Sequence, residues 1–163
     1  MNPLQTPMGT SRVVWVAGAA GAAGGAIIDA WIAAGARVVA TDVHGCASGE
    51  HVTGLACDGT CHSDIDAVIA ECRRLGGLDV FVNCAGAMPK AGSPEITVEV
   101  WNELFDLNVR GPQLCSQAAA REMVATGKGG WIVRIDPENA ETVSVDSVAC
   151  HGLSGPVRVL EAA

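Results

Sequence analysis

The sequence has 163 residues, of which 49% are hydrophobic and 17% charged, and its net charge at neutral pH is −8. This length and apolar content suit one globular domain and argue against a disordered chain. The acidic balance, with Lys90 and Lys128 as the two lysines, predicts no nucleic-acid partner, because phosphate backbones are bound by basic patches. No apolar run reaches the ~20 residues of a membrane helix, and no secretory signal is visible, so we expect a cytoplasmic protein without membrane contact.

Short apolar runs alternate with longer helical segments along the chain. We expect strands over 12–17, 37–41, 52–57, 78–83 and 131–135, and helices over 24–34, 63–75, 97–107 and 111–126. Strands that are apolar throughout, interleaved with helices, favour a parallel sheet covered on both faces. The pattern therefore predicts one α/β domain over residues 1–163, with 1–11 as a flexible N-terminal extension.

Three glycines at every third position follow the first strand and open the first helix: Gly18, Gly21 and Gly24. Such a turn lets a pyrophosphate approach the N–H groups at a helix N-terminus. Asp42 ends the second strand, where a carboxylate accepts the adenosine ribose hydroxyls and repels a 2′-phosphate. The pattern favours a dinucleotide site that prefers NAD(H) to NADP(H). The alternative is a packing turn beside a solvated acid.

The glycine turn and the end of the second strand resemble those of the short-chain dehydrogenase/reductase family. The segment VAGAAGAAG (16–24) is similar to the family's turn, with Ala17 where threonine is usual and Ala22 in place of the middle glycine. TDV (41–43) resembles the family's NAD-preferring strand end. Because the Ala22 methyl group would intrude where the family has glycine, NAD(H) binding is expected to be weakened or lost.

Three later motifs extend the resemblance over nearly the whole chain. The resemblance implies that Asp58 of ACDGT contacts the adenine ring. It implies that Asn83, Ala85 and Gly86 of NCAGA line the cofactor site and support the sheet. Asn108 matches the helix-interrupting asparagine of the family's catalytic tetrad. These likenesses make the glycine turn, Asp42 and this group the candidate cofactor and catalytic residues.

The resemblance also implies a Rossmann-like, doubly wound parallel sheet of about five strands in the order 3-2-1-4-5. Family members continue into two further strands and a substrate-covering loop, so we expect a truncated member that ends in a helix containing Pro156. The strand at 131–135 would then be an open apolar edge, which favours association. This edge predicts a homo-oligomer, most simply a homodimer, as does an apolar stripe on helix 111–126. The stripe consists of Leu114, Ala118, Ala119 and Met123.

The family's catalytic serine, tyrosine and lysine have no counterparts in this sequence, which contains no tyrosine. Asp136 follows the fifth strand, where the family has its serine. Asp146 and Cys150 align with the tyrosine and lysine, or Ser147 and His151 after a one-residue slip. Carbonyl reduction needs a proton donor whose pKa suits the reaction, and an ionised aspartate does not provide one. Ordinary alcohol dehydrogenase or ketone reductase activity is therefore expected to be absent.

Three functions stay open for such a chain. One is a binding or scaffold protein that uses the nucleotide fold without catalysis. Another is an enzyme for non-redox acid–base work, such as a cyclisation, isomerisation or elimination on a small metabolite, with Asn108, Asp136 and Asp146 as catalytic residues. The third is a divergent NAD-dependent oxidoreductase. The first two are preferred at this point, and the sequence does not identify the substrate.

A cluster of metal-ligating residue types lies between the second strand and the second helix. Zinc prefers such ligands, but their spacing matches no common zinc pattern, so we expect no metal. In a chain without an export signal, the cysteines are expected to be reduced. The cluster comprises His44, Cys46, His51, Cys57, Cys61 and His62.

Overall fold

The computed structural model describes residues 11–87, 96–135 and 159–162, the last of these as backbone. The elements in chain order are β1 (Val13–Ala17), α1 (Ala22–Ala33), β2 (Arg37–Asp42), β3 (Val52–Ala56), α2 (His62–Arg74), β4 (Val80–Asn83), α3 (Val98–Phe105), the π-helical turn η2 (Asp106–Arg110), α4 (Gly111–Thr126), β5 (Gly130–Arg134) and β6 (Val159–Ala162). Up to β5, every expected strand and helix is present, with ends within two residues of the prediction.

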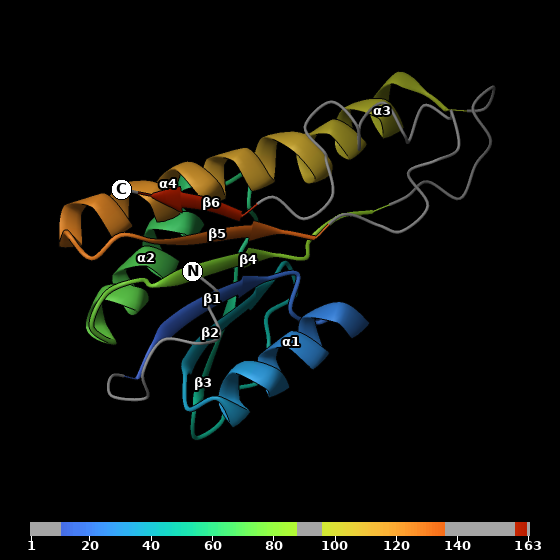
Figure 1. The fold of residues 1–163 in the computed structure, drawn as a ribbon. Coiled ribbons are helices and arrows are strands. Elements are labelled where there is room, and N and C mark those ends of the chain that lie inside the picture. Colours follow the sequence, from blue (N-terminus) through green and yellow to red (C-terminus); the bar gives the residue numbers. More distant parts are fainter. Residues whose placement is uncertain (1–10, 88–95, 136–158, 163) are drawn as a thin grey trace.

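The strands form one sheet in the order β3-β2-β1-β4-β5-β6 (Figure 1). The first five are parallel, which confirms the predicted Rossmann-like sheet with strand order 3-2-1-4-5. Two predictions at the far edge are wrong. β5 is not an open edge, because β6 pairs with it in antiparallel register, and Val159–Ala162 is a strand, not a helix. The unpaired N–H and C=O groups of an edge strand provide the partners for such an added strand. Pro156 lies outside the described residues.

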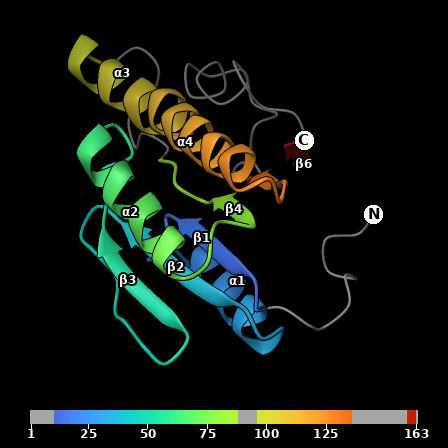
Figure 2. The same cartoon turned by 90° about the vertical axis from the view of Figure 1, so that its left-hand side faces the viewer.

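Helices cover both faces of the sheet: α1 lies on one face, and α2 and α4 lie side by side on the other (Figures 1 and 2). On the α2/α4 face the side chains of Trp15 and Phe81 are fully buried, with ring centroids 4.3 Å apart. On the α1 face Val14, Val16 and Val38 are buried. The continuous apolar character of β1 thus fills two core layers at once, as in a sheet that is buried on both sides. Within the described residues, no helix is long and apolar enough to cross a bilayer.

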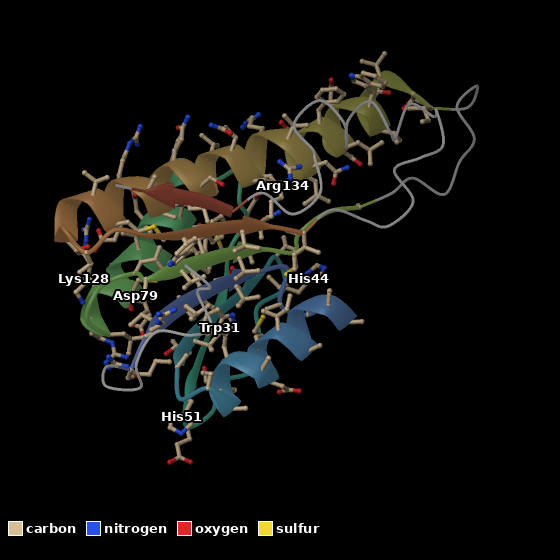
Figure 3. The ribbon with its side chains drawn as sticks, viewed as in Figure 1. Trp31, His44, His51, Asp79, Lys128 and Arg134 are labelled. Atoms are coloured by element: carbon tan, nitrogen blue, oxygen red, sulfur yellow. The ribbon has the colours of Figure 1, made fainter. Side chains whose placement is uncertain are left out.

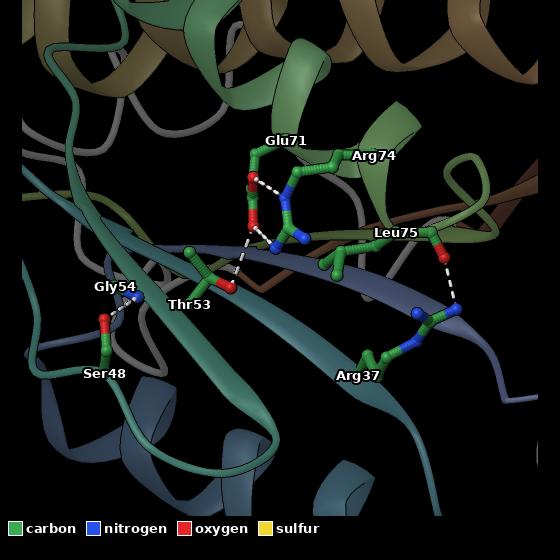
Figure 4. Close-up of polar contacts among 7 residues, drawn as sticks. All are labelled: Arg37, Ser48, Thr53, Gly54, Glu71, Arg74 and Leu75. Atoms are coloured by element: carbon green, nitrogen blue, oxygen red, sulfur yellow. Dashed lines mark hydrogen bonds and ion pairs between the residues drawn. The ribbon is translucent and has the colours of Figure 1, made fainter.

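Polar contacts fix α2 against its neighbours. Glu122 of α4 is 2% exposed, and its carboxylate lies 2.7 Å from the Arg73 guanidinium. At the β3 side, Thr53 Oγ1 donates to Glu71 Oε1 at 3.0 Å, and Arg74 donates to the same carboxylate (Figure 4). The hydrogen bonds from Arg74 hold the pKa of Glu71 below its ordinary value. These contacts keep the helix that follows the Asp58 loop in place.

The apolar stripe of α4 faces the protein's own core. Ala119 and Met123 are fully buried against the sheet, and Leu114 and Ala118 are partly buried against the same cluster. The stripe is therefore used within the chain, and β6 covers the other feature that suggested association. The homodimer stays a prediction that has lost both of its original supports.

Candidate functional site

A cavity of about 250 Å³ opens at the carboxyl ends of the parallel strands. Its wall comes from the glycine turn after β1, the ends of β2 and β4, the loop after β3, and the junction of η2 with α4. In a doubly wound sheet, ligands bind at this edge, where the strand order reverses. We call the part around Gly18, Gly21, Asp42 and Asp58 the turn end. The part where β4 and β5 finish, around Asn83 and Gly86, is the β5 end.

The glycines of the turn have different roles. Gly18 has a positive φ of 76°, and a Cβ added there would lie 2.5 Å from the backbone nitrogen of Ala85. Gly24 is buried, and its Cβ would lie 2.4 Å from the Gly18 carbonyl oxygen, although Gly24 does not line the cavity. A Cβ on Gly21 would meet only that oxygen, at 3.4 Å. Steric contacts therefore require glycine at 18 and 24. At position 21 glycine is not required by packing, and the missing side chain leaves space in the cavity.

Ala22 does not crowd the cavity. It is the first residue of α1, its side chain is exposed, and it is not among the residues that line the cavity. The expectation that its methyl group weakens cofactor binding stays a prediction, to which the cavity wall adds no support. Gly21, one residue earlier, supplies the lining at this point.

Asp42 ends β2 beside the glycine turn. Its Oδ2 accepts a hydrogen bond from Ala20 N at 3.3 Å, and the preceding Thr41 carbonyl accepts from the N–H groups of Gly18 and Ala19 at 2.9 and 3.1 Å. These contacts hold the turn against the end of β2. The Asp42 carboxylate is thereby part of the cavity wall, as its position in the sequence suggested.

Asp58 lies in the loop between β3 and α2, at the turn end. Its Oδ1 accepts from Thr60 N at 2.8 Å and from Thr60 Oγ1 at 2.7 Å. These hydrogen bonds, the backbone one first, lower the pKa of Asp58 below its ordinary value. Its own N–H donates to Asp64 Oδ2 at 3.0 Å. The cavity therefore has an ionised carboxylate at this point, held by its own loop.

The loop after β4 forms the floor of the β5 end. Asn83 is 3% exposed, and its Nδ2 donates to the Ala85 carbonyl at 3.2 Å. Asn83, Ala85 and Gly86 all line the cavity. The structure thus brings these three expected residues together with the glycine turn, whose Gly18 lies against the Ala85 backbone.

Asn108 is buried in η2, and its side chain is hydrogen-bonded to the loop after β4. Its Nδ2 donates to the Ala87 carbonyl at 2.8 Å, and its Oδ1 accepts from Ala87 N at 2.9 Å. Its main-chain carbonyl accepts a hydrogen bond from the guanidinium of Arg134. Asn108 does not itself line the cavity. The other two candidate catalytic residues, Asp136 and Asp146, lie outside the described residues.

Three cysteines that were not expected at the site line the cavity: Cys57, Cys84 and Cys115. Burial is the main cause that raises their pKa values, to about 11 for Cys57 and Cys84 and to about 12 for Cys115. They are therefore neutral thiols at physiological pH and contribute apolar surface. In the part of the chain that the structure describes, no three His, Cys, Asp or Glu side chains come together as a metal site.

A family model for the short chain dehydrogenases matches residues 12–149. The chain belongs to this family. Among curated relatives, this short-chain dehydrogenase is 40% identical over 92 residues to the uncharacterized oxidoreductase YohF of Escherichia coli. It is 35% identical over 132 residues to the sorbitol dehydrogenase of Cereibacter sphaeroides, and 32% identical over 171 residues to the D-threitol dehydrogenase of Mycolicibacterium smegmatis. These alignments cover 54%, 76% and 93% of the chain, but 36%, 52% and 64% of the relatives, so the chain spans about half the length of the relatives that it matches.

Solved structures carry the same fold. A short-chain dehydrogenase from Leptospira borgpetersenii with bound NAD+ superposes with a TM-score of 0.80 at 20% identity, over 88% of this chain and 62% of that one. One from Streptomyces avermitilis superposes with a TM-score of 0.73 at 29% identity, over 88% of this chain and 55% of that one. At 20% identity, the likeness to the Leptospira borgpetersenii structure shows the fold alone.

Proposed function

We propose that this short-chain dehydrogenase is an NAD(H)-dependent oxidoreductase that acts on a small hydroxylated molecule. The observation that carries the proposal is the Asp42 carboxylate in the cavity wall, fixed to the glycine turn through Ala20 N. The names of the curated relatives, which include sorbitol, D-threitol and galactitol dehydrogenases, favour this function over the non-redox and scaffold alternatives.

The residues of the cavity fit a dinucleotide. The glycine turn leads into α1, whose first N–H groups have no acceptor within the helix and can face a pyrophosphate. Asp42 would accept the two ribose hydroxyls and repel a 2′-phosphate, which favours NAD(H) over NADP(H). Asp58 would contact the adenine, and Asn83, Ala85 and Gly86 would border the nicotinamide half. Bound there, NAD(H) supplies the acceptor or donor of the hydride.

Asn108, Asp136 and Asp146 are the proposed catalytic residues of this chain. Asn108 would act by holding the loop after β4 against η2, as its two hydrogen bonds to Ala87 suggest. Asp146 would take or give the proton of the reacting hydroxyl. This role requires an environment that raises the pKa of its carboxyl, because an ionised aspartate repels a developing alkoxide.

The lack of tyrosine favours a second candidate function, a dinucleotide-binding protein that does not perform redox chemistry. Calorimetry and turnover distinguish the two. We expect NADH to bind to the chain more tightly than NADPH. We also expect NAD+ reduction with at least one of sorbitol, D-threitol, galactitol and glycerol. NADH binding without any turnover would support the second candidate, and failure to bind either dinucleotide would overturn both.

We further propose that the protein is a homo-oligomer, because members of the short-chain dehydrogenase family are typically oligomeric. Sedimentation at tens of micromolar is the direct measurement. A single species at the chain mass of 16.6 kDa would overturn the proposal.

A further inference from the structure

The connection between the parallel strands β2 and β3 contains no helix. Residues 43–51, which we call the crossover loop, consist of turn, bend and irregular backbone. In Figure 3, His44 lies near the carboxyl ends of the strands and His51 at the opposite edge of the sheet, so the loop returns along the sheet without a helical segment. Beside this loop, the cover of the sheet face comes from α1, which packs on β1 and β2.

Hydrogen bonds hold the crossover loop against β3. Gly49 N donates to the Val52 carbonyl at 2.8 Å, and Ser48 Oγ accepts from Gly54 N at 2.9 Å (Figure 4). A Cβ on Gly54 would collide with the Cys46 carbonyl oxygen, so glycine at this position lets the loop lie directly on the strand. The loop is therefore a wall that exists before any ligand binds, which lowers the cost of binding.

A second hollow, of about 450 Å³, lies between the crossover loop and α1. Ligand pockets in proteins commonly have volumes of about 300–1,000 Å³. Most of its wall is apolar, and Ile28, Ile32 and Val52 are partly buried there against the core of the α1 face. The hollow shares no lining residue with the cavity at the carboxyl ends of the strands. It is therefore a separate site on the α1 face.

Asp29 of α1 is the charged residue in the wall of the second hollow, and none of the lining residues is Lys, Arg or His. The Asp29 side chain is exposed, and among the described residues it has no ion-pair partner. Burial, and then the charge of Asp42, raises the pKa of the Cys46 thiol, so this lining residue is neutral at physiological pH. The hollow thus combines an apolar wall with one unpaired carboxylate.

We propose that the second hollow binds a small organic cation, an ammonium group on a short apolar chain. The ammonium group would lie against the Asp29 carboxylate, and the apolar chain would cover Ile28, Ile32 and Val52 and be removed from water there. An anion would meet the charge of Asp29 without a compensating cation, in a chain with a net charge of −8. Because the two sites have different walls, this ligand and a dinucleotide can be bound at the same time.

The test compares three probes that share one apolar chain: hexylammonium, 1-hexanol and hexanoate. Each is titrated into the isotope-labelled chain, and the amide signals are followed by NMR. We expect hexylammonium to bind about fivefold more tightly than hexanol, and hexanoate to bind most weakly. The signals of the crossover loop and of Ile28 and Ile32 should shift. Those of Gly59 and Gly86, which line the cavity at the carboxyl ends, should not.

Two variants and a control sharpen the test. Asp29→Asn keeps the shape of the side chain and should remove the advantage of hexylammonium over hexanol. Ala47→Trp, at an exposed residue of the wall, should fill the hollow and weaken the binding of all three probes. Asp66→Asn, which changes an exposed carboxylate on α2, should leave every affinity unchanged.

The wild-type protein alone can overturn the proposal, even if a variant fails to fold. Equal affinities for hexylammonium and hexanol contradict it, as does the absence of binding of all three probes. Shifts confined to residues of the cavity at the carboxyl ends would place the cation beside Asp42 and Asp58 instead, and would also contradict it. A preference for hexylammonium that survives in folded Asp29→Asn would show that this carboxylate does not select the ligand.

Discussion

At the turn end of the cavity, closely packed backbone makes the wall, whereas at the β5 end side-chain hydrogen bonds hold the wall together. At the turn end, the Gly18 backbone lies against that of Ala85, and Ala20 N donates to Asp42 Oδ2. At the β5 end, Asn108 holds Ala87, and Arg134 holds Asn108, across 21 and 26 positions. The shape of the turn end thus depends on steric contacts, whereas the shape of the β5 end depends on hydrogen bonds. Substitutions at the two ends should therefore fail in different ways.

The largest effect is expected from an added methyl group at Gly18. Gly18→Ala puts a Cβ 2.5 Å from Ala85 N at a φ of 76°, so the turn and the β4 loop must separate. We expect a loss of about 3 kcal/mol or more in the free energy of unfolding, measured by urea denaturation. Gly21→Ala is the matched control, with a cost of about 1 kcal/mol at a helix N-cap. Equal stabilities of the two variants would contradict the steric account of the turn end.

At the β5 end, removal of a side chain should matter through lost hydrogen bonds. Asn108→Ala leaves Ala87 N and O without their partners, and we expect it to destabilise the protein by about 2 kcal/mol. Asn83→Ala removes one longer bond, of 3.2 Å to Ala85 O, and should cost about half as much. Hydrogen exchange of the Ala87 amide provides a local measurement. Unchanged protection of this amide in Asn108→Ala would show that the clamp is not needed.

A substitution at Asp42 can weaken cofactor binding at the turn end without a change in packing. Asp42→Asn keeps the shape and removes the charge, so we expect NADH to bind about tenfold more weakly, while NADPH binding is unchanged or improved. Asp66→Asn, which alters an exposed carboxylate on α2, should change neither affinity. Calorimetry with both dinucleotides measures the ratio. If Asp42→Asn kept the full preference for NADH, another group would have to select the cofactor.

The fold could be predicted up to β5 because each strand is a local apolar run whose burial follows from its own residues. β6 could not, since VLEA at 159–162 contains residues that favour helix, and its strand state comes from pairing with β5. Likewise, the stripe of α4 was correctly recognised as apolar. What it packs against could not be predicted, because periodicity does not say whether Ala119 and Met123 meet the chain's own sheet, as they do, or another subunit.

The features of the candidate site also divide into those that could be predicted from the sequence and those that could not. Gly18 and Asp42 were found from local spacing and Asp58 from the family resemblance, and all three line one cavity. The hydrogen bond from Arg134 to the Asn108 carbonyl was not predicted, because nothing in WIVRI indicates that this guanidinium reaches a carbonyl 26 residues earlier. The cysteines were expected to be reduced thiols, without a place in the site. Cys84 and Cys115 line the cavity because of where β4 ends and α4 begins, and this position follows only from the assembled sheet.

The smallest effect is expected at Asp58, where the charge of one exposed carboxylate acts through its own loop. Hydrogen bonds from Thr60 lower its pKa in the folded protein, so its contribution to stability is present above the unfolded value near 3.8 and is lost as the pH falls through the folded value. Asp58→Asn keeps an acceptor oxygen for Thr60 and removes the charge. Because the group is exposed, solvent screening limits the expected loss at pH 7 to less than about 1 kcal/mol. Urea denaturation at pH 7 and at pH 3 measures it: the wild type should be the more stable at pH 7, and the gap should narrow at pH 3. A gap that stays constant over this range would assign the effect to the shape of the loop, and the turn end would then be held by geometry alone.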